Sequence, residues 1–292
     1  MTTRIDSPSN PRIQAAVKAI ASGETMLLEG IRMIEEALEA GVEVEEFFVR
    51  EEKEEDFLRK GRGAGDARAT VAPARVTCVS ARVLRRLSDL PSTRGVVALA
   101  KPPHRTLASL SSLLPWKKTA SSNAPREAAI PRKRGSEGEG PLFLVLDDLQ
   151  DPANVGAILR SGEAFGAAAA LLTPGCAWPF SPRALRASAG SAFRLPVCAR
   201  VTAGEAVAWA RRLGIGLAGA EAHGGDPPES LAAVRPLALV IGSEGHGISP
   251  EIAAALDHRI TLPLAGQVES LNAAVAAGVL LDVLTRRPAS MR

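Results

Sequence analysis

The chain has 292 residues, of which 46% are hydrophobic and 23% charged, a balance typical of a globular protein with about two domains. Residues 1–140 carry a net charge of +4 (23 Lys and Arg, 19 Asp and Glu), and residues 141–292 carry −1 (12 Arg, no Lys, 13 Asp and Glu). No apolar run reaches the ~20 residues of a membrane helix, and three widely spaced cysteines fit neither a disulfide framework nor a metal clip.

The first residues, MTTRIDSPSNPR, lack the apolar segment of a signal peptide, so we expect a cytoplasmic protein without membrane spans. The four histidines lack the ligand spacing of a zinc site, and no metal is expected. The net charge of +3 permits a polyanionic partner without requiring one. Arginine alone carries the positive charge of the second half, which fits phosphate binding, although a GC-rich genome would produce the same bias.

Residues 1–101 alternate short helical and strand-like segments, which predicts a compact α/β domain. The sequence SPSNP marks a helix start, because Asn is a good cap and Pro suits the first turn. Predicted strands cover residues 26–28, 44–49, 75–79 and 95–100, and predicted helices begin near residues 11, 31 and 51.

Residues 102–140 lose this pattern. The segment KKTASSNAPREAAIPRKRGSEGEG is rich in Ser, Pro, Gly and Ala and has no periodic apolar face, which predicts a flexible linker. Its basic cluster, residues 132–134, is interpreted either as an RNA-phosphate contact or, more commonly, as a solvated charge run.

Residues 141–292 predict a second α/β domain. Short apolar runs alternate there with helical stretches, a pattern typical of a parallel sheet covered on both faces. The runs are LFLVLD, AAALLT, FRLPV, IGLAGA, LALVIG and RITLPL, and the helical stretches begin near Ala153, Pro182, Gly204, Pro250 and Ser270.

Several cofactor chemistries are excluded by missing motifs. No GxGxxG follows the first strand of the second domain, and GSEGHG at residues 242–247 has the wrong glycine spacing for a dinucleotide fingerprint. No GxxxxGK[ST] occurs, and the second domain has no lysine to serve a phosphate loop. Ordinary nucleotide hydrolysis is therefore excluded.

Polar residues in otherwise apolar turns are the remaining candidates for a site. Asn154 stands at a helix entry, where it is either a cap or a site residue. Arg160 lies on a face of small residues in the same predicted helix, and Glu244 stands between glycines directly after a strand. Ser270 and Asn272 open the last helix, where Ser270 is either its N-cap or a site residue.

Three blocks resemble the signature motifs of the SpoU (TrmH-like) family of SPOUT-class RNA methyltransferases. They are NVGAILRSGEAFG at residues 154–166, LVIGSEGHGIS at 239–249 and ITLPLAGQVESLNAAVAAG at 260–278. The segment SPRALRASAGSAFRLPV at 181–197 is also similar to the family, and the resemblance covers residues 141–287. Residues 1–101 resemble the family's substrate-binding domain more loosely, through SPSNPRI and LLEGIRMIEEAL.

The resemblance implies a C-terminal parallel-sheet SPOUT domain with a trefoil knot and a small N-terminal α/β domain that binds RNA. It implies transfer of the methyl group of S-adenosylmethionine to a ribose 2′-hydroxyl of structured RNA. Members that act on rRNA and on tRNA share these motifs, and the distinct N-terminal domain favours rRNA. It also implies a homodimer in which the last helix contributes to the interface and each active site is completed by the partner. The implied cofactor-binding residues are Gly242, Ile260, Leu262, Gly266 and Leu271.

The resemblance also assigns roles to the polar candidates. Arg160 is placed at the reacting hydroxyl, where a permanently charged guanidinium suits phosphate binding and alkoxide stabilisation better than proton abstraction. Glu244 is expected to orient Arg160 or the target ribose. Asn154, Ser270 and Asn272 are expected to position the nucleotide through hydrogen bonds.

The chain departs from the family pattern at two places in the third block. Leu264 follows Pro263 where Met is usual, and two alanines at 273–274 stand where Ser-Val is common. The absence of Tyr and the 3% aromatic content favour RNA recognition by shape and phosphate contacts over base stacking.

Four alternatives stay open at this point. They are a tRNA 2′-O-methyltransferase, a catalytically inactive RNA-binding relative, a SPOUT enzyme acting on a base nitrogen, and a nucleotide-linked oxidoreductase, which the missing fingerprint disfavours.

Overall fold

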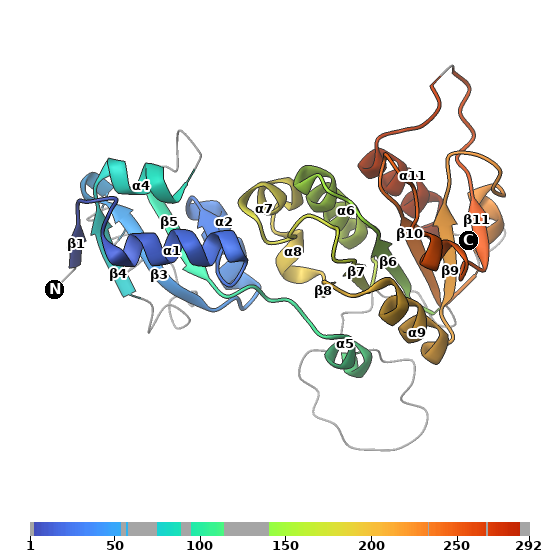
Figure 1. Cartoon of the computed structure of the whole chain (residues 1–292), viewed down its shortest axis with the longest axis horizontal. Helices are drawn as coiled ribbons and strands as arrows, with labels where there is room; N and C mark the ends of the chain where they lie inside the picture. Colours follow the sequence, from blue (N-terminus) through green and yellow to red (C-terminus); the bar gives the residue numbers. More distant parts are fainter. Residues whose placement is uncertain are drawn as a thin grey trace. The chain divides into compact units, whose positions relative to one another are not determined.

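The computed structural model describes residues 3–53, 57, 75–88, 95–113, 140–232, 234–266 and 268–286 (Figure 1). Its contacts divide the chain into two compact units. The first unit contains residues 1–103 together with 180–194, and the second contains residues 104–179 together with 195–292.

The first unit is built on a five-stranded mixed sheet in the order β1-β4-β3-β5-β2. β1, β4 and β3 are parallel, whereas β5 runs antiparallel to β3 and β2. Its elements are β1 (Thr3–Ile5), α1 (Pro11–Ser22), β2 (Met26–Glu29), α2 (Ile31–Glu39), β3 (Val44–Arg50), the 3-10 turn η1 (Glu51–Lys53), β4 (Arg75–Val79), α4 (Ala81–Leu87), β5 (Val96–Ala100), α7 (Pro182–Ser188) and α8 (Ser191–Arg194).

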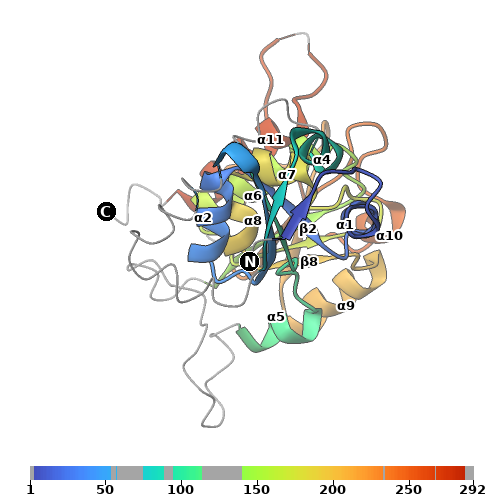
Figure 2. The ribbon, with the colours of Figure 1, turned by 90° about the vertical axis from the view of Figure 1, so that its left-hand side faces the viewer.

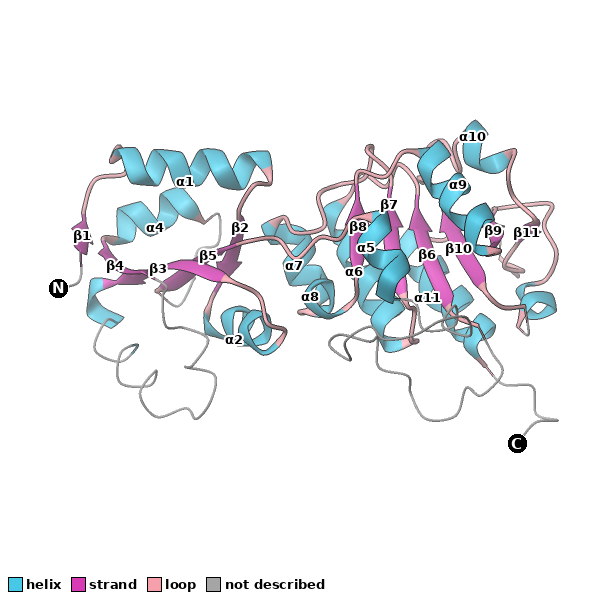
Figure 3. Ribbon diagram, turned by 90° about the horizontal axis from the view of Figure 1, so that it is seen from below, coloured by secondary structure: helices cyan, strands magenta, loops and turns pink. Residues whose placement is uncertain are grey.

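Helices cover both faces of this sheet. α1 and α4 lie on one side and α2 on the other (Figure 3). Ile13 of α1 and Val83 of α4 are fully buried against Phe48 of β3 and Val97 of β5. The predicted helix start is confirmed, because Asn10 caps α1 by accepting a hydrogen bond from the Arg12 N–H at 3.0 Å. The acidic helix expected from residue 51 begins as η1, and most of it lies outside the described residues.

The second unit contains a six-stranded sheet whose strands are all parallel, in the order β11-β9-β10-β6-β7-β8. Every apolar run predicted as a strand in residues 141–292 contributes one of them. The elements are α5 (Leu107–Leu113), β6 (Leu142–Leu146), α6 (Pro152–Ala164), β7 (Ala169–Leu172), β8 (Val197–Ala199), α9 (Ala203–Leu213), β9 (Gly216–Ala220), the 3-10 helix η3 (Pro228–Leu231), β10 (Leu237–Ile241), α10 (Pro250–Ala253), β11 (His258–Ile260) and α11 (Ala273–Thr285).

The central strands of this sheet are buried on both faces, as their uninterrupted apolar sequences require. One face packs against α9, where the ring of Trp209 meets Phe143 edge-on with centroids 5.2 Å apart. The other face is covered by α6 and α11, which pack along each other. Gly278 of α11 approaches Ser161 of α6 there, and a Cβ added at Gly278 would lie 3.6 Å from the serine Oγ.

The predicted linker is in part a structured helix. α5 covers residues 107–113, and Leu110 is fully buried in the cluster formed by the sheet and α9. α5 lies beside α9 (Figures 1 and 2), and Ser111 Oγ accepts a hydrogen bond from Trp209 Nε1 at 3.0 Å. The flexible linker predicted for residues 102–140 therefore includes a helix, whose Leu107 and Leu110 pack in a groove that only tertiary folding creates. The segment expected to lack a periodic apolar face begins after this helix, at residue 117. Residues 114–139 of the predicted linker lie outside the described residues.

Residues 180–194 are predicted to belong to the second domain, which is expected to begin at residue 141. Their contacts group them with the N-terminal unit. Arg186 of α7 forms an ion pair with Glu29 of β2, whose side chain is 4% exposed. Ser88 donates a second hydrogen bond to the same carboxylate. The predicted domain boundaries themselves stay a prediction.

Leu110→Ala is expected to lower the free energy of unfolding by about 2–5 kcal/mol, because it leaves a cavity in the packed face between α5 and α9. Urea unfolding followed by tryptophan fluorescence measures the change. Ala108→Ser, at an exposed position of the same helix, is the control and is expected to shift the value by less than about 0.5 kcal/mol. Equal stability of the two variants would show that α5 is not part of the core.

Candidate functional site

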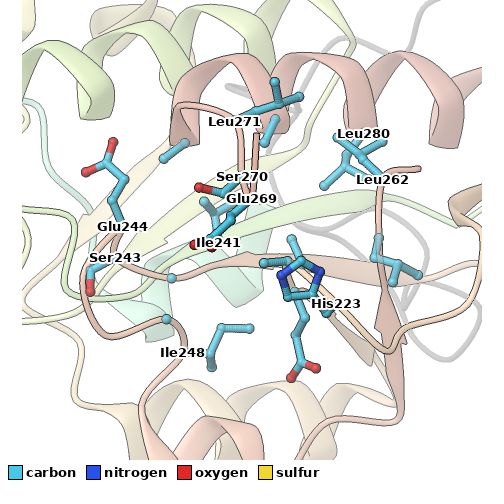
Figure 4. Close-up of a pocket in the computed structure, with 18 of the residues that line it drawn as sticks. His223, Ile241, Ser243, Glu244, Ile248, Leu262, Glu269, Ser270, Leu271 and Leu280 are labelled. Carbon is cyan, nitrogen blue, oxygen red and sulfur yellow. The ribbon is translucent and has the colours of Figure 1, made fainter. Parts of the chain in front are cut away.

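The carboxyl ends of β9, β10 and β11 surround a pocket of about 490 Å³. Because these strands are parallel neighbours, the loops that follow them meet at one edge of the sheet. The loop before α11 and the first turns of that helix close another side of the pocket (Figure 4). Ile241, Ile260 and Leu280 supply apolar wall, and Ser243 and Ser270 supply hydroxyls.

Most of the predicted cofactor-binding residues line this pocket. Gly242, Ile260, Leu262 and Leu271 are among its lining residues. Gly266 is not; a Cβ added there would have no neighbour within 4 Å. The family resemblance implied these four positions. The structure brings them to one cavity because they lie at or after the ends of neighbouring strands, or just before the last helix.

Gly242 is required by the turn that follows β10. Ser243 and Gly247 exchange two backbone hydrogen bonds at 3.0 and 2.9 Å, which folds residues 243–247 tightly back on themselves. A Cβ at Gly242 would lie 2.3 Å from the carbonyl carbon of Gly247 and 2.5 Å from the Ile248 nitrogen. Gly247 has φ +69°, a left-handed conformation that favours glycine. The turn therefore holds Glu244 at the pocket rim.

Three of the predicted polar residues form one hydrogen-bonded clamp, made of Asn154, Glu244 and Asn272. Asn154 Nδ2 donates to Glu244 Oε1. Asn272 Nδ2 donates to Asn154 Oδ1 at 3.0 Å and to Glu244 Oε1 at 3.3 Å. The clamp ties the first turn of α6, the loop after β10 and the start of α11 together, although these segments lie up to 118 residues apart.

The expected capping roles are corrected by the structure. Asp151, not Asn154, is the N-cap of α6, and its carboxylate accepts from the Ala153 N–H at 2.9 Å. Pro152 begins the helix, which frees the buried Asn154 side chain for the clamp. Asn272, not Ser270, caps α11, because its Oδ1 accepts from the Ala274 and Val275 N–H groups at 3.0 and 3.3 Å. Ser270 instead lines the pocket.

Arg160 is not brought to the pocket of its own chain. It lies in the second half of α6 with its side chain exposed, and it is not among the pocket-lining residues. Six residues separate it from Asn154, which places it about 9 Å further along the helix axis. A single copy of the chain therefore assembles Asn154, Glu244, Ser270 and Asn272, and leaves Arg160 outside.

The sequence interpretation missed several polar residues of this edge. Glu221 and His223 follow β9 and line the pocket, as does Glu269 before α11 (Figure 4). Glu221 forms an ion pair with Arg259. Applying the strand-end rule to the run IGLAGA would have found Glu221 and His223, since they come directly after it.

Asp147 is a further residue that the sequence interpretation missed, and it connects the end of β6 with the loop after β10. It is 3% exposed, and its Oδ2 accepts a hydrogen bond from the Ser249 N–H at 2.7 Å. Its own N–H donates to the Ile241 carbonyl at 2.9 Å. The buried carboxylate thus fixes the far end of the loop that begins at Gly242.

The cysteines do not supply a nucleophile. Burial raises the pKa of Cys198 to about 11 and also raises the pKa of Cys176, so both thiols are neutral near pH 7. Cys78 and Cys198 are buried, Cys176 is half-buried, and none of the three forms a disulfide, as expected. Among the described residues, no group of three or more His, Cys, Asp or Glu side chains is arranged to hold a metal ion. None of the described helices is both long and apolar enough to cross a bilayer.

The model of the SpoU rRNA Methylase family matches residues 141–282, and that of the MRM3-like substrate binding domain matches residues 21–98. Residues 141–282 form a SpoU methylase family domain. All strands of the second unit and the whole clamp lie inside this domain.

Similar proteins carry related names. An uncharacterized tRNA/rRNA methyltransferase of Mycobacterium ulcerans is 39% identical over 147 residues, which is 50% of this chain and 47% of that protein. The chain thus aligns with about half the length of the curated relatives it matches. The crystal structure of an RNA 2′-O ribose methyltransferase is 29% identical, with a TM-score of 0.67 and coverage of 97% of this chain and 98% of that one.

A second solved structure bears on the pocket. The SpoU methyltransferase AviRb from Streptomyces viridochromogenes, in complex with the cofactor AdoMet, is 25% identical. Its TM-score is 0.68, and the match covers 94% of this chain and 97% of that one. The α/β fold with a parallel-sheet SpoU domain and an N-terminal substrate-binding domain is therefore confirmed.

Asn272→Asp separates the two functions of the Asn272 side chain in the SpoU domain. The new carboxylate still caps α11, but it cannot donate to Asn154 and it faces the Glu244 carboxylate. Repulsion between two ionised carboxylates is expected to destabilise the variant at pH 7. Its stability deficit against the wild type should shrink in acid, because the introduced carboxyl group becomes protonated there and can donate.

Thermal unfolding at several pH values checks this expectation. Asn272→Ala, which loses both functions without adding charge, is the matched control and is expected to cost about 0.5–2 kcal/mol at every pH. Parallel pH profiles for the two variants would show that Glu244 does not face this position.

Proposed function

We propose that the SpoU domain transfers the methyl group of S-adenosylmethionine to a ribose 2′-hydroxyl of structured RNA. The observation that carries the proposal is the clamp of Asn154, Glu244 and Asn272 at the rim of a small-molecule pocket. The names of the similar proteins, which include an RNA 2′-O ribose methyltransferase, support the same reaction class. The trefoil knot stays a prediction that rests on the family resemblance.

The pocket fits the proposed cofactor in size and chemistry. A volume of about 490 Å³ falls within the range of small-molecule sites. Ile260, Leu262 and Leu271 offer apolar surface for an adenine ring, and the close backbone at Gly242 offers main-chain hydrogen-bonding groups. Glu269 adds a carboxylate near the Ser270 hydroxyl, which suits a cationic ligand. The bound sulfonium would supply an activated methyl group.

The chain's own residues then have to orient the ribose, accept or relay the proton of its 2′-hydroxyl, and stabilise the negative charge that develops on its oxygen. Asn154 and Asn272 are held rigidly by Glu244, so Glu244 is a positioning residue. This refines the expected role of Glu244, whose Oε1 already accepts from both amides. Ser270 lines the pocket and offers a hydroxyl to the nucleotide. Pre-organised groups of this kind lower the barrier by proximity and orientation.

Arg160 reaches a pocket through a second copy of the chain. Val275 and Val279, four residues apart on α11, are 53% and 42% exposed and form an apolar strip on the helix that packs along α6. A homodimer that buries this strip brings the two copies together at α6 and α11. Each Arg160 then serves the partner's pocket, where it binds the neighbouring phosphate and stabilises the alkoxide.

Ribosomal RNA is the proposed substrate. The support is the separate N-terminal unit, which matches an MRM3-like substrate binding domain and would recognise an extended RNA element. The tRNA alternative shares the same SpoU motifs and is an outcome of the experiment on Arg160 below.

Gly242→Ala is expected to abolish S-adenosylmethionine binding, because its Cβ would collide with the backbone of residues 247 and 248 and open the turn that shapes the pocket. Isothermal titration calorimetry measures the affinity. Gly245→Ala is the matched control: a Cβ there has no neighbour within 4 Å, and binding should change by less than about threefold. Equal affinities would place the cofactor elsewhere.

Arg160→Ala is expected to lower kcat by about 10²–10³-fold, as for loss of a group that stabilises a developing oxyanion, while leaving cofactor affinity unchanged. Total RNA from a strain lacking the protein, incubated with each variant, allows the 2′-O-methyl sites to be mapped. A site restored in rRNA supports the proposal, and a site restored only in tRNA overturns the choice of substrate. Near-normal activity of the variant would remove Arg160 from the mechanism.

Mixing inactive Arg160→Ala with inactive Gly242→Ala extends this test to the dimer. If each site takes Arg160 from the partner, half of the sites in mixed dimers receive neither substitution, and about a quarter of wild-type activity returns. No recovery despite subunit exchange would show that Arg160 acts within its own chain.

A further inference from the structure

A second cluster of side chains lies at the same edge of the SpoU-domain sheet, outside the cofactor pocket. It consists of His104 before α5, Trp178 in the loop after β7, and Arg200 directly after β8. The Arg200 guanidinium carbon lies 4.9 Å from the centroid of the Trp178 ring, which is a cation–π distance. The His104 ring meets the same indole edge-on at 6.1 Å. His104 and Arg200 are exposed, and Trp178 is half-buried.

The backbone on either side of Arg200 is firmly anchored. Arg200 itself has φ +61°, a left-handed conformation that is unfavourable for a residue with a side chain. Ala199 precedes it as the last residue of β8, and the buried Val201 follows, with its N–H bonded to the Leu172 carbonyl at 3.0 Å. The residue after His104 is tied to β8 as well, through the Arg105 N–H and the Val197 carbonyl at 2.7 Å. Strain of this kind, maintained by its surroundings, occurs often at binding sites.

The parallel sheet places this cluster beside the pocket along one edge. The pocket lies at the carboxyl ends of β9, β10 and β11, and the cluster lies at the carboxyl ends of β7 and β8. In the order β10-β6-β7-β8, β7 and β8 lie two and three strand spacings from β10 (Figure 3), which is roughly 10–14 Å at the usual distance between neighbouring strands. A few nucleotides of a single strand span such a distance.

We propose that His104, Trp178 and Arg200 bind a nucleotide of the RNA strand next to the methylated one. This inference rests on the proposed function, since it assigns the cluster to the same substrate. An indole and a guanidinium are the surfaces on which unpaired bases stack, and the outer N–H groups of Arg200 can fork a phosphate. His104 adds a hydrogen-bonding ring at the indole edge. The sequence-based expectation of little aromatic stacking therefore has one exception, at the reacting edge.

Binding of a fluorescein-labelled U20 oligonucleotide, measured by anisotropy on the full-length protein, tests the proposal. Trp178→Ala and Arg200→Ala are each expected to weaken binding on the order of tenfold, whereas Trp178→Phe, which keeps an aromatic face, should lose about threefold or less. Arg212→Ala is the matched charge control. Arg212 is exposed in the last turn of α9, so it lies at the opposite edge of the sheet, and its loss should have little effect.

The proposal is overturned if Trp178→Ala and Arg200→Ala bind U20 as tightly as Arg212→Ala does. It is also overturned if poly-glutamate displaces U20 as well as unlabelled U20 does, since a general anion site would then explain the cluster. Should Trp178→Ala fail to fold, the U20 affinities of Arg200→Ala and Arg200→Lys decide instead. Lysine keeps the positive charge but cannot stack as a planar group, so both variants should bind more weakly than the wild type.

A parallel measurement separates this inference from the proposed function. S-adenosylmethionine affinity, measured by calorimetry, should be unchanged in Trp178→Ala and Arg200→Ala, and the KM for RNA should rise while kcat holds. If the wild type methylates no RNA but the substitutions still weaken U20 binding, the RNA contact stands and the proposed activity fails. If the wild type methylates RNA and the substitutions change neither KM nor U20 affinity, the activity stands and the contact fails.

Discussion

The parallel direction of all six strands in the second unit is the constraint on which the site depends. Parallel strands bring every carboxyl end, and every loop that follows one, to the same edge of the sheet. Residues from β6, β9, β10 and β11 meet there, although the connecting helices separate them widely in sequence. The opposite edge receives the helix C-termini and contributes nothing to the pocket. The topology of the sheet alone therefore places these polar residues of the SpoU domain close together, whatever specific contacts their side chains make.

The clamp converts this proximity into fixed geometry. One amide, Asn272, satisfies the first N–H groups of α11 and donates to Asn154 and Glu244 with its other end. Because a charged acceptor strengthens such hydrogen bonds, Glu244 stabilises the positions of both neutral amides. Asp147 has a comparable role below it, where a buried carboxylate holds the Ser249 N–H and closes the loop after β10. The pocket is therefore shaped by carboxylates that bind backbone and amide groups of the chain itself.

Arg160, Val275 and Val279 are exposed in the single chain, so a surface that could contact a second copy is left uncovered. An apolar strip on α11 and an arginine on its neighbour α6 belong to one surface, so burial of the first would bring the second into use. In the proposed homodimer, hydrophobic burial would drive association and would bring Arg160 to the partner's pocket. The cluster around Trp178 lies in the loops that follow β7 and β8, and its His104 and Arg200 side chains are exposed.

The sequence alone predicted the strands of the SpoU domain and the helix start at Asn10, because apolar periodicity and capping chemistry are local signals. The family resemblance, rather than those signals, supplied Gly242, Ile260, Leu262 and Leu271, which line one pocket. Only the tertiary structure decided that Asp151 and Asn272 are the caps, that Asn154 turns toward Glu244, and that α5 packs on α9. It also excluded Gly266 from the pocket lining and placed Arg160 outside its own pocket. The contact of Asn154 with Glu244 and the packing of α5 on α9 join residues 90 and 98 positions apart in the sequence, and no local pattern contains that information.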